Sequence, residues 1–249
     1  MKTLFALMLL CASSLSAAIR TESVTYKDGE QVLEGMLAWD DSQSGPRPGV
    51  LVVHDWTGLQ DYAKGRAKQL AGLGYVAFAA DIYGKDIRPT DPKECAVCAG
   101  KYKSDLPLLR KRVSLAMDQL KSQKTVDPKR LGAIGYCFGG TCVLELARSG
   151  ADVSGVVSFH GGLATSLPAA PGTIKARILV CHGGADDAVN KEVPAFQEEM
   201  KKSEAKMEFV TYEGAKHGFT KPGPAYQEKA DKESWAAMEK FFKEVFAKK

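Results

Sequence analysis

The stretch Leu131-Gly-Ala-Ile-Gly-Tyr-Cys-Phe-Gly-Gly140, which runs into Thr141-Cys-Val-Leu-Glu-Leu-Ala-Arg148, decides the fold of this chain. It predicts a short apolar strand, a sharp turn that carries Cys137, and then a helix. The spacing Gly135-x-Cys137-x-Gly139 is that of a nucleophile elbow, in which glycines let strand and helix approach closely. Such a turn points the thiol at the helix N-terminus, where unpaired N–H groups favour a thiolate and an oxyanion. The alternative is a glycine-rich turn around a buried structural cysteine.

The composition is that of an ordinary globular chain. It has 249 residues, of which 45% are hydrophobic and 26% are charged, enough for one sizeable core. Residues 1–18 resemble a signal peptide, with Lys2, an apolar run and small residues at positions 16 and 18. We expect cleavage after Ala18, export to the periplasm or the medium, and a single mature domain at residues 19–249. No other stretch of the sequence is long and apolar enough to predict a membrane span.

The charge excludes some classes of partner. Removal of Lys2 with the signal lowers the formal net charge from +4 to +3, which is too small a bias to predict binding to nucleic acid or to a membrane surface. A mildly basic site for an anionic small molecule is compatible with this charge. We expect a small-molecule partner and a monomer or a weak dimer.

Five cysteines are left after the signal: Cys95, Cys98, Cys137, Cys142 and Cys181. In an oxidising compartment an odd number leaves at least one free thiol, which a thiol nucleophile requires. Cys95 and Cys98 predict either a local disulfide or two plain thiols, because a zinc site would need a second ligand pair that the sequence lacks. Cys142 and Cys181 are predicted to be core residues.

Strands and helices are predicted to alternate along the chain. Residues 22–38 predict an antiparallel hairpin with its turn at Asp28-Gly29. Buried strands are expected at residues 50–53, 75–80, 131–136, 153–159, 177–181 and 207–212, and helices at 62–71, 105–121, 138–148, 192–202 and 227–247. Residues 86–103 look like an excursion over the sheet edge that lines an active site. The alternation predicts an α/β fold with a mostly parallel sheet wrapped by helices on both faces.

Polar clusters follow the predicted strands, at residues 54–58, 81–85, 135–140, 160–162, 182–187 and 214–221. Because the carboxyl ends of parallel strands meet at one edge of the sheet, we expect these clusters to form one site. A thiol nucleophile needs a base and an acid that orients the base. In α/β-hydrolases the chain order is nucleophile, acid, histidine. Cys137, Asp186 and His217 fit this order, and Asp187 competes with Asp186 for the role of the acid.

The chain resembles the dienelactone hydrolase family, the carboxymethylenebutenolidases, over residues 20–249. The resemblance rests on five segments: His54-Asp-Trp-Thr-Gly58, Ala80-Asp-Ile-Tyr-Gly-Lys85, Gly135-Tyr-Cys-Phe-Gly-Gly140, Gly184-Ala-Asp186 and Ala215-Lys-His-Gly-Phe219. It implies an α/β-hydrolase fold and the cleavage of a carboxylic ester or lactone through a Cys–His–Asp triad, with no metal or organic cofactor.

The resemblance also implies roles for residues around the triad. Asp55 matches a carboxylate, usually glutamate, that holds the resting thiol and helps to ionise it. The backbone N–H groups of Trp56 and Phe138 match the oxyanion hole, where each donor is worth about 3 kcal/mol of barrier.

Substrate contacts are expected from four residues: Tyr83, Lys85, His160 and Lys221. The two lysines stand where the archetype has carboxylate-binding arginines, so charge is retained while the planar bidentate fork is lost. For His160, a hydrogen-bonded role behind the site is the alternative to substrate contact. Solvated surface charges are the alternative for both lysines.

Two other functions are compatible with the sequence. One is an exported binding protein that kept the hydrolase fold and lost catalysis, which the shortened Asp55 and the missing arginines favour. The other is a thiol redox protein that uses Cys95 and Cys98, although that pair lacks the strand-to-helix setting of a thioredoxin-like site.

Overall fold

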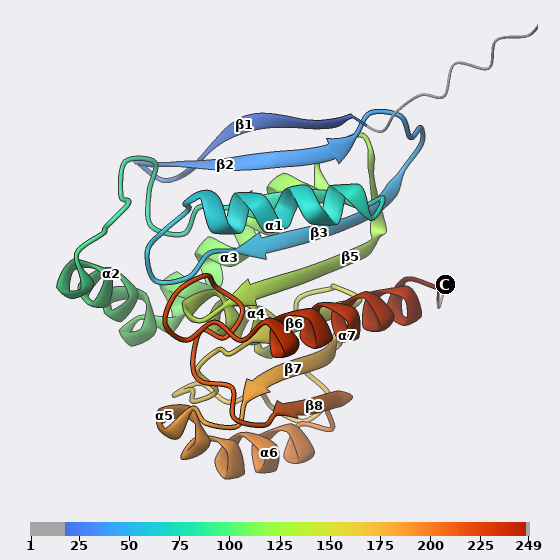
Figure 1. Ribbon diagram of the computed structural model, residues 1–249. Coiled ribbons are helices and arrows are strands. Elements are labelled where there is room, and N and C mark those ends of the chain that lie inside the picture. Colours follow the sequence, from blue (N-terminus) through green and yellow to red (C-terminus); the bar gives the residue numbers. More distant parts are fainter. Residues whose placement is uncertain (1–17, 248–249) are drawn as a thin grey trace, which may run out of the picture.

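The computed structural model describes residues 18–247. The predicted signal peptide therefore lies, except for Ala18, outside the described residues. One sheet of eight strands runs through the described part, in the order β1-β2-β4-β3-β5-β6-β7-β8, with helices on both faces (Figure 1). The predicted α/β class, with an antiparallel hairpin added to a mostly parallel sheet, is confirmed.

The hairpin forms one edge of the sheet. Strands β1 (Ile19–Asp28) and β2 (Gln31–Asp40) are antiparallel, and their turn contains Gly29 at a φ of 58°. A positive φ is a conformation that glycine adopts without steric cost. Strand β2 then pairs antiparallel with β4 (Val76–Ala80), which joins the hairpin to the parallel part.

The remaining strands are parallel: β3 (Arg47–Val53), β5 (Val126–Tyr136), β6 (Gly155–Phe159), β7 (Arg177–Gly183) and β8 (Met207–Tyr212). The helices are α1 (Asp61–Gly72), α2 (Pro92–Ser104), α3 (Leu106–Lys121), α4 (Phe138–Arg148), α5 (Asp187–Asn190), α6 (Val193–Lys202) and α7 (Glu228–Ala247). Every parallel strand thus reaches the same edge of the sheet at its carboxyl end.

Each face of the sheet has its own apolar core. Helices α1 and α7 cover one face, where Leu70 and Phe242 share a buried cluster with Val52. Helices α2, α3, α4 and α6 cover the other, where Val113 packs in a cluster with Leu51. Consecutive strand residues face opposite sides, so the continuous apolar run of β3 serves both cores. Burial of each such side chain stabilises the fold by about 1.5–3 kcal/mol.

Residues 86–103, expected as an excursion, fold mainly into helix α2. Its start is specified locally, because the Asp91 carboxylate accepts hydrogen bonds from the N–H groups of Lys93 and Glu94, and Pro92 occupies the first turn. Cys95 and Cys98 lie one turn apart on this helix as free thiols. Of the two alternatives for this pair, the structure has the plain thiols.

The other structural expectations for cysteines hold, since Cys142 and Cys181 are fully buried.

Within residues 18–247, no helix combines the length and the hydrophobicity that crossing a membrane requires.

The elbow at Cys137 depends on close backbone contact. Cys137 has φ 54° and ψ −112°, a backbone conformation that residues other than glycine rarely adopt. A Cβ atom on Gly135 would lie 2.0 Å from the Gly139 carbonyl oxygen, and one on Gly139 would lie 2.2 Å from the Val53 carbonyl oxygen. Only glycines therefore let β3, β5 and α4 meet at this point.

We predict that Gly139→Ala destabilises the protein, because backbone atoms of β3 cannot move aside cheaply. The free energy of unfolding in urea should fall by about 1–3 kcal/mol or more. The control is Gly65→Ala in helix α1, where no atom lies within 4 Å of the new Cβ, and where alanine should add about 0.5–1 kcal/mol. Equal stability of the two variants would contradict this account of the elbow.

Candidate active site

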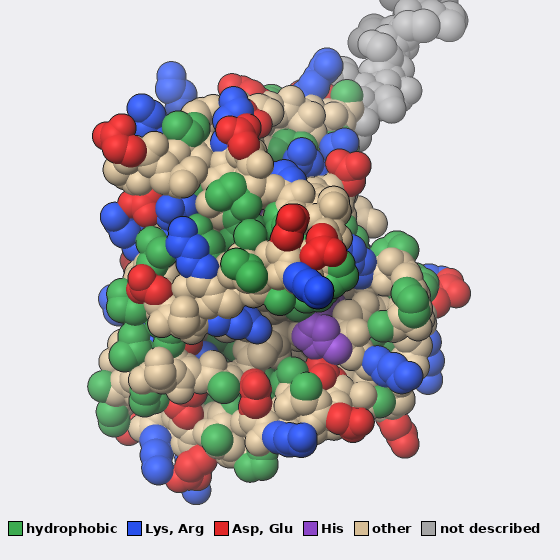
Figure 2. Space-filling model, turned by 90° about the vertical axis from the view of Figure 1, so that its left-hand side faces the viewer, with side chains coloured by type: hydrophobic (Ala, Val, Ile, Leu, Met, Phe, Trp, Pro, Cys, Tyr) green, Lys and Arg blue, Asp and Glu red, His purple; other side chains and the backbone are tan. Residues whose placement is uncertain are grey.

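A cavity of about 670 Å³ opens at the carboxyl edge of the parallel strands. Segments from five parts of the chain contribute side chains to it, among them Trp56, Ala99, Cys137, His160, His217 and Lys221. A histidine lies at a hollow of the face in Figure 2, between lysine and carboxylate side chains. Since the side chain of His217 is 41% exposed and the other three histidines are buried, His217 is the histidine at the surface.

The structure brings the three predicted triad residues together. His217 Nε2 lies 3.0 Å from Cys137 Sγ, and His217 Nδ1 lies 2.7 Å from Asp186 Oδ2. Asp186 is buried and accepts a hydrogen bond from the Val189 N–H, so helix α5 fixes its carboxylate. Asp187, the competing acid, is exposed on the first turn of that helix. The row thiol, imidazole, carboxylate is the geometry of nucleophilic catalysis.

The charge of His217 follows from its neighbours. Partial burial disfavours the imidazolium, but the Cys137 sulfur and then the Asp186 carboxylate outweigh burial and raise the pKa of His217 to about 9. His217 therefore carries its proton at neutral pH, where it can donate that proton to a leaving oxygen.

Asp55 is directed at Lys221 in this structure. Its Oδ2 lies 2.5 Å from Lys221 Nζ, and its Oδ1 accepts from the N–H of Thr57 at 2.8 Å. Burial favours the neutral carboxyl, but the hydrogen bonds from Lys221 and Thr57 outweigh it and lower the pKa of Asp55. In this structure Asp55 makes hydrogen bonds with Thr57 and Lys221 and none with Cys137. The Cys137 thiol is instead hydrogen-bonded to His217.

Trp56 and Phe138 offer backbone N–H groups at the cavity. Phe138 is the first residue of α4, so its N–H has no acceptor within the helix. Trp56 N donates no hydrogen bond to the described residues. The Phe138 side chain is fully buried and that of Trp56 is 38% exposed, so packing by the side chains and binding by the backbone are compatible at both positions.

His160 reaches the cavity with both ring nitrogens occupied. Its Nδ1 accepts a hydrogen bond from the Cys137 N–H at 3.2 Å, so Nε2 carries the proton and donates it to Thr220 Oγ1 at 2.7 Å. Burial, followed by the charge of His217, lowers the pKa of His160 to about 3. The ring is neutral and joins the elbow to the loop that carries His217, which fits the alternative role behind the site.

Two predicted substrate contacts do not line the cavity. Tyr83 is buried and donates its hydroxyl hydrogen to the Trp56 carbonyl at 3.2 Å. Lys85 Nζ is 3.1 Å from Glu34 Oε2 on strand β2. The carboxyl end of β4 therefore supports the site from behind.

The segment 86–103 lines the cavity as predicted, but it does so through helix α2, which the sequence did not predict. Ala96, Ala99, Gly100 and Lys103 share one face of this helix and line the cavity. Lys103 makes no ion pair within the described residues, whereas Lys221 does. The signal that could have revealed this face is Asp91-Pro92, a helix-start pattern.

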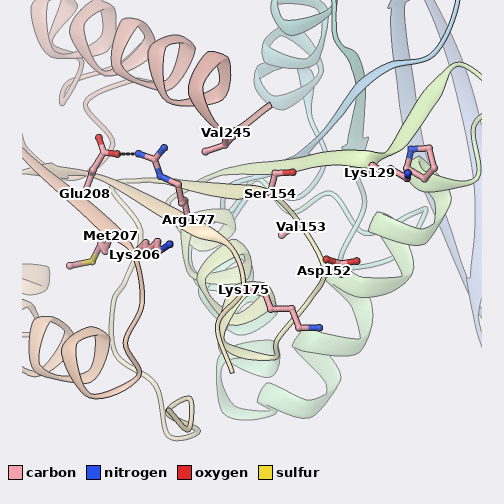
Figure 3. Close-up of a pocket in the computed structure, with 11 residues that line it drawn as sticks. Lys129, Asp152, Val153, Ser154, Lys175, Arg177, Lys206, Met207, Glu208 and Val245 are labelled. Atoms are coloured by element: carbon pink, nitrogen blue, oxygen red, sulfur yellow. Dashed lines mark hydrogen bonds and ion pairs between the residues drawn. The ribbon is translucent and has the colours of Figure 1, made fainter. Parts of the chain in front are cut away.

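A second cleft, of about 730 Å³, lies where the parallel strands begin, at the other end of the sheet (Figure 3). Its walls carry charged residues such as Lys175, Arg177 and Glu208, and Arg177 is ion-paired with Glu208. The cleft has no cysteine or histidine in its lining. Among residues 18–247, no group of three or more His, Cys, Asp or Glu side chains is arranged to hold a metal ion.

The family profile of the dienelactone hydrolase family matches residues 33–246. The chain belongs to the dienelactone hydrolase family. It is 40% identical to an uncharacterized protein of Caenorhabditis elegans over 151 residues, which is 56% of this chain and 95% of that protein.

Solved structures agree with this membership. The chain is similar to the structure named m3DLH, with a TM-score of 0.87 and 40% identity over 92% of this chain and 99% of that one. It is also similar to P91 from metagenomic libraries, named a dienelactone hydrolase-like promiscuous phosphotriesterase. The TM-score there is 0.86 and the identity 37%, over 93% of this chain and all of that one. The chain is therefore a hydrolase of this family with the α/β-hydrolase fold.

We predict that Cys137→Ala lowers the pKa of His217, because the sulfur is the larger of the two favourable influences on the imidazolium. Wild-type His217 should titrate near pH 9 in an NMR experiment on the histidine ring signals. Since this value lies above the ordinary 6.5, the charged ring adds stability that is full below about pH 6.5 and is lost as pH rises through about 9. His160 should stay neutral in both proteins and serves as the internal control. An unchanged His217 midpoint in the variant would contradict the influence of the sulfur on the pKa of His217.

Proposed function

We propose that the protein hydrolyses small carboxylic esters or lactones through a thioester on Cys137. The observation that carries the proposal is the continuous row from Cys137 Sγ through His217 to the buried Asp186, set in a cavity at the carboxyl edge of the sheet. Membership of the dienelactone hydrolase family supports the same chemistry.

The first half of the reaction forms the thioester. The Cys137 thiolate attacks the carbonyl carbon, and the carbonyl oxygen becomes an oxyanion that the N–H groups of Trp56 and Phe138 stabilise. The carbonyl re-forms as the bond to the leaving oxygen breaks, and His217 gives that oxygen its proton. Asp186 keeps the ring oriented with Nε2 toward the sulfur.

The second half releases the acid. His217, now neutral, takes a proton from water, and the resulting hydroxide attacks the thioester carbon. The same N–H groups hold the second oxyanion, and the sulfur leaves as thiolate beside the recharged imidazolium. The products are a carboxylic acid and the alcohol or enol, and the proposed reaction consumes only the ester or lactone and water.

Leaving-group chemistry narrows the substrate. A thiolate departs from the tetrahedral intermediate more readily than an alkoxide, so esters of simple alcohols tend to return to reactant. Enol lactones and aryl esters release a stabilised oxygen anion and are favoured. A cavity of about 670 Å³ has the size of an ordinary small-molecule site.

Two lysines make an anionic substrate compatible with this cavity. Lys103 and Lys221 both line it, and Lys103 has no ion-pair partner among residues 18–247. A substrate carboxylate would compete with Asp55 for Lys221. Because an ammonium is a point charge, we propose charge recognition with less geometric selectivity than an arginine fork gives.

Phosphate triesters are a second candidate substrate class. The similar protein P91 is named a promiscuous phosphotriesterase, and Trp56 and Pro222 give this cavity apolar surface that suits an uncharged triester. Attack by the thiolate would form an S–P bond and release the aryloxide. A dialkyl p-nitrophenyl phosphate in the assay described below would test this class.

We also propose that the protein is exported, on the strength of residues 1–18. Expression of the full chain in a bacterium should place it in the periplasmic fraction with an N-terminus at Ile19, read by intact mass and N-terminal sequencing. Replacing residues 4–12 by polar residues is the control that should retain the full-length chain in the cytoplasm. A full-length wild-type chain in the cytoplasm would overturn export.

The proposed activity predicts that Cys137→Ala abolishes hydrolysis. Saturable wild-type turnover of p-nitrophenyl acetate and of a panel of neutral and anionic lactones should fall about a thousandfold or more. Intact mass after short incubation should reveal one acyl group on the wild type and none on the variant. Cys98→Ala, a half-buried thiol on α2, is the matched control and should retain activity.

Equal rates for wild type and Cys137→Ala, with no adduct, would overturn the hydrolase proposal. The binding-protein hypothesis would then be the better account of the cavity.

A further inference from the structure

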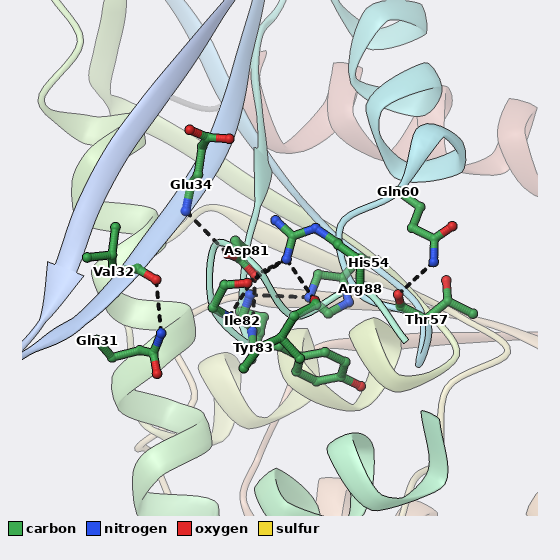
Figure 4. A network of polar contacts seen from close by, with 12 residues as sticks. Gln31, Val32, Glu34, His54, Thr57, Gln60, Asp81, Ile82, Tyr83 and Arg88 are labelled. Atoms are coloured by element: carbon green, nitrogen blue, oxygen red, sulfur yellow. Dashed lines mark hydrogen bonds and ion pairs between the residues drawn. The ribbon is translucent and has the colours of Figure 1, made fainter. Parts of the chain in front are cut away.

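The loop after β3, which carries Trp56, is held by a buried histidine. The Ile82 N–H donates to His54 Nε2 at 3.2 Å, so Nε2 is an acceptor and the ring proton is on Nδ1. Nδ1 lies 2.6 Å from the Asp55 carbonyl oxygen and donates to it. Figure 4 places the His54 ring between the Asp81–Tyr83 backbone and this loop. Burial lowers the pKa of His54, in agreement with a neutral ring that has one donor and one acceptor.

This hydrogen bond fixes the direction of the Trp56 N–H. The Asp55 carbonyl and the Trp56 N–H belong to one planar trans peptide unit and point in opposite directions. A carbonyl held by His54 on one side therefore aims the N–H to the other side. That N–H donates to no described residue, so it is free to bind an oxyanion.

The next peptide unit is held as well. The Tyr83 hydroxyl donates to the Trp56 carbonyl at 3.2 Å, and the Thr57 N–H of the same unit donates to Asp55 Oδ1 at 2.8 Å. Trp56 thus sits between two peptide units that are both immobilised. Neither His54 nor Tyr83 lines the cavity.

The groups that hold the loop are themselves rigidly supported. The buried Asp81 carboxylate accepts hydrogen bonds from the N–H groups of Tyr83 and Gly84 and pairs with Arg88 (Figure 4). The His54 ring contacts Tyr83 edge-on at 4.8 Å and stacks on Phe138 at 5.9 Å between ring centroids. It therefore touches the residue that supplies the second oxyanion donor.

We propose that His54 and Tyr83 are positioning residues of the oxyanion hole, which act by locking the two peptide units around Trp56. This inference rests on the proposed function and adds residues that do not touch the substrate. A preorganised donor stabilises the oxyanion without reorganising during the reaction, so loosening the loop should slow acyl transfer selectively.

The test separates acyl transfer from thiol reactivity. Ester hydrolysis needs the oxyanion hole, whereas alkylation of Cys137 by iodoacetamide creates no oxyanion on a carbonyl and needs only the thiolate. Tyr83→Phe removes the hydroxyl and keeps the ring. His54→Asn keeps an N–H near the position of Nδ1, whereas His54→Gln places its amide near Nε2 and loses the donor to Asp55. Tyr212→Phe, a buried tyrosine on β8, is the control.

Tyr83→Phe and His54→Gln should lower kcat for p-nitrophenyl acetate by about 10- to 100-fold, with KM little changed and the alkylation rate within about twofold of wild type. His54→Asn should retain more activity than His54→Gln, and Tyr212→Phe should match wild type. Circular dichroism checks folding, and if the His54 variants do not fold, Tyr83→Phe decides.

Unchanged kcat in Tyr83→Phe and His54→Gln, or an equal loss of hydrolysis and alkylation, would overturn the inference. The proposed function would still stand in that case, because wild-type turnover supports it. Absence of Cys137-dependent turnover in the wild type would overturn the proposed function, and this inference with it.

Discussion

The close backbone contact at the elbow is the constraint on which the rest of this structure depends. Gly135 and Gly139 leave no room for a Cβ atom, because carbonyl oxygens of α4 and β3 lie about 2 Å from where it would be. This contact holds Cys137 at a positive φ above the sheet edge. The strained conformation persists because apolar cores on both faces of the sheet hold β3, β5 and α4 in place. The packing of the two cores therefore keeps the Cys137 thiol in its strained position at the sheet edge.

Around the thiol, the histidines divide into charged and neutral roles according to burial. His217 is partly exposed and faces sulfur and carboxylate, which favours the imidazolium. His54 and His160 are buried, and each uses one nitrogen as a donor and the other as an acceptor. A neutral ring with fixed tautomer holds backbone in place without adding positive charge next to His217. The same residue type is therefore charged beside the thiol and neutral where it holds the backbone.

Much of this arrangement was predictable because it depends on local pattern. The elbow spacing, the hairpin turn at Gly29 and the apolar strands specify an α/β sheet, and the structure has each of them. The order of Cys137, Asp186 and His217 along the chain also predicted their meeting, because parallel strands end at one edge. Helix α2 was missed although Asp91 caps it, since its weak apolar periodicity concealed a helix whose one face lines the cavity.

The sequence by itself determined the fold class and the family, and it predicted that Cys137, Asp186 and His217 meet, because these follow from residue spacing and strand order. Only the tertiary structure decided which partner each polar group has. Lys85 is turned to Glu34 while Lys221 reaches Asp55, and Tyr83 supports the loop of Trp56 instead of lining the cavity. The physical reason is that direction and burial of a side chain depend on elements distant in the chain, which packing brings within hydrogen-bond distance and spacing along the sequence does not encode.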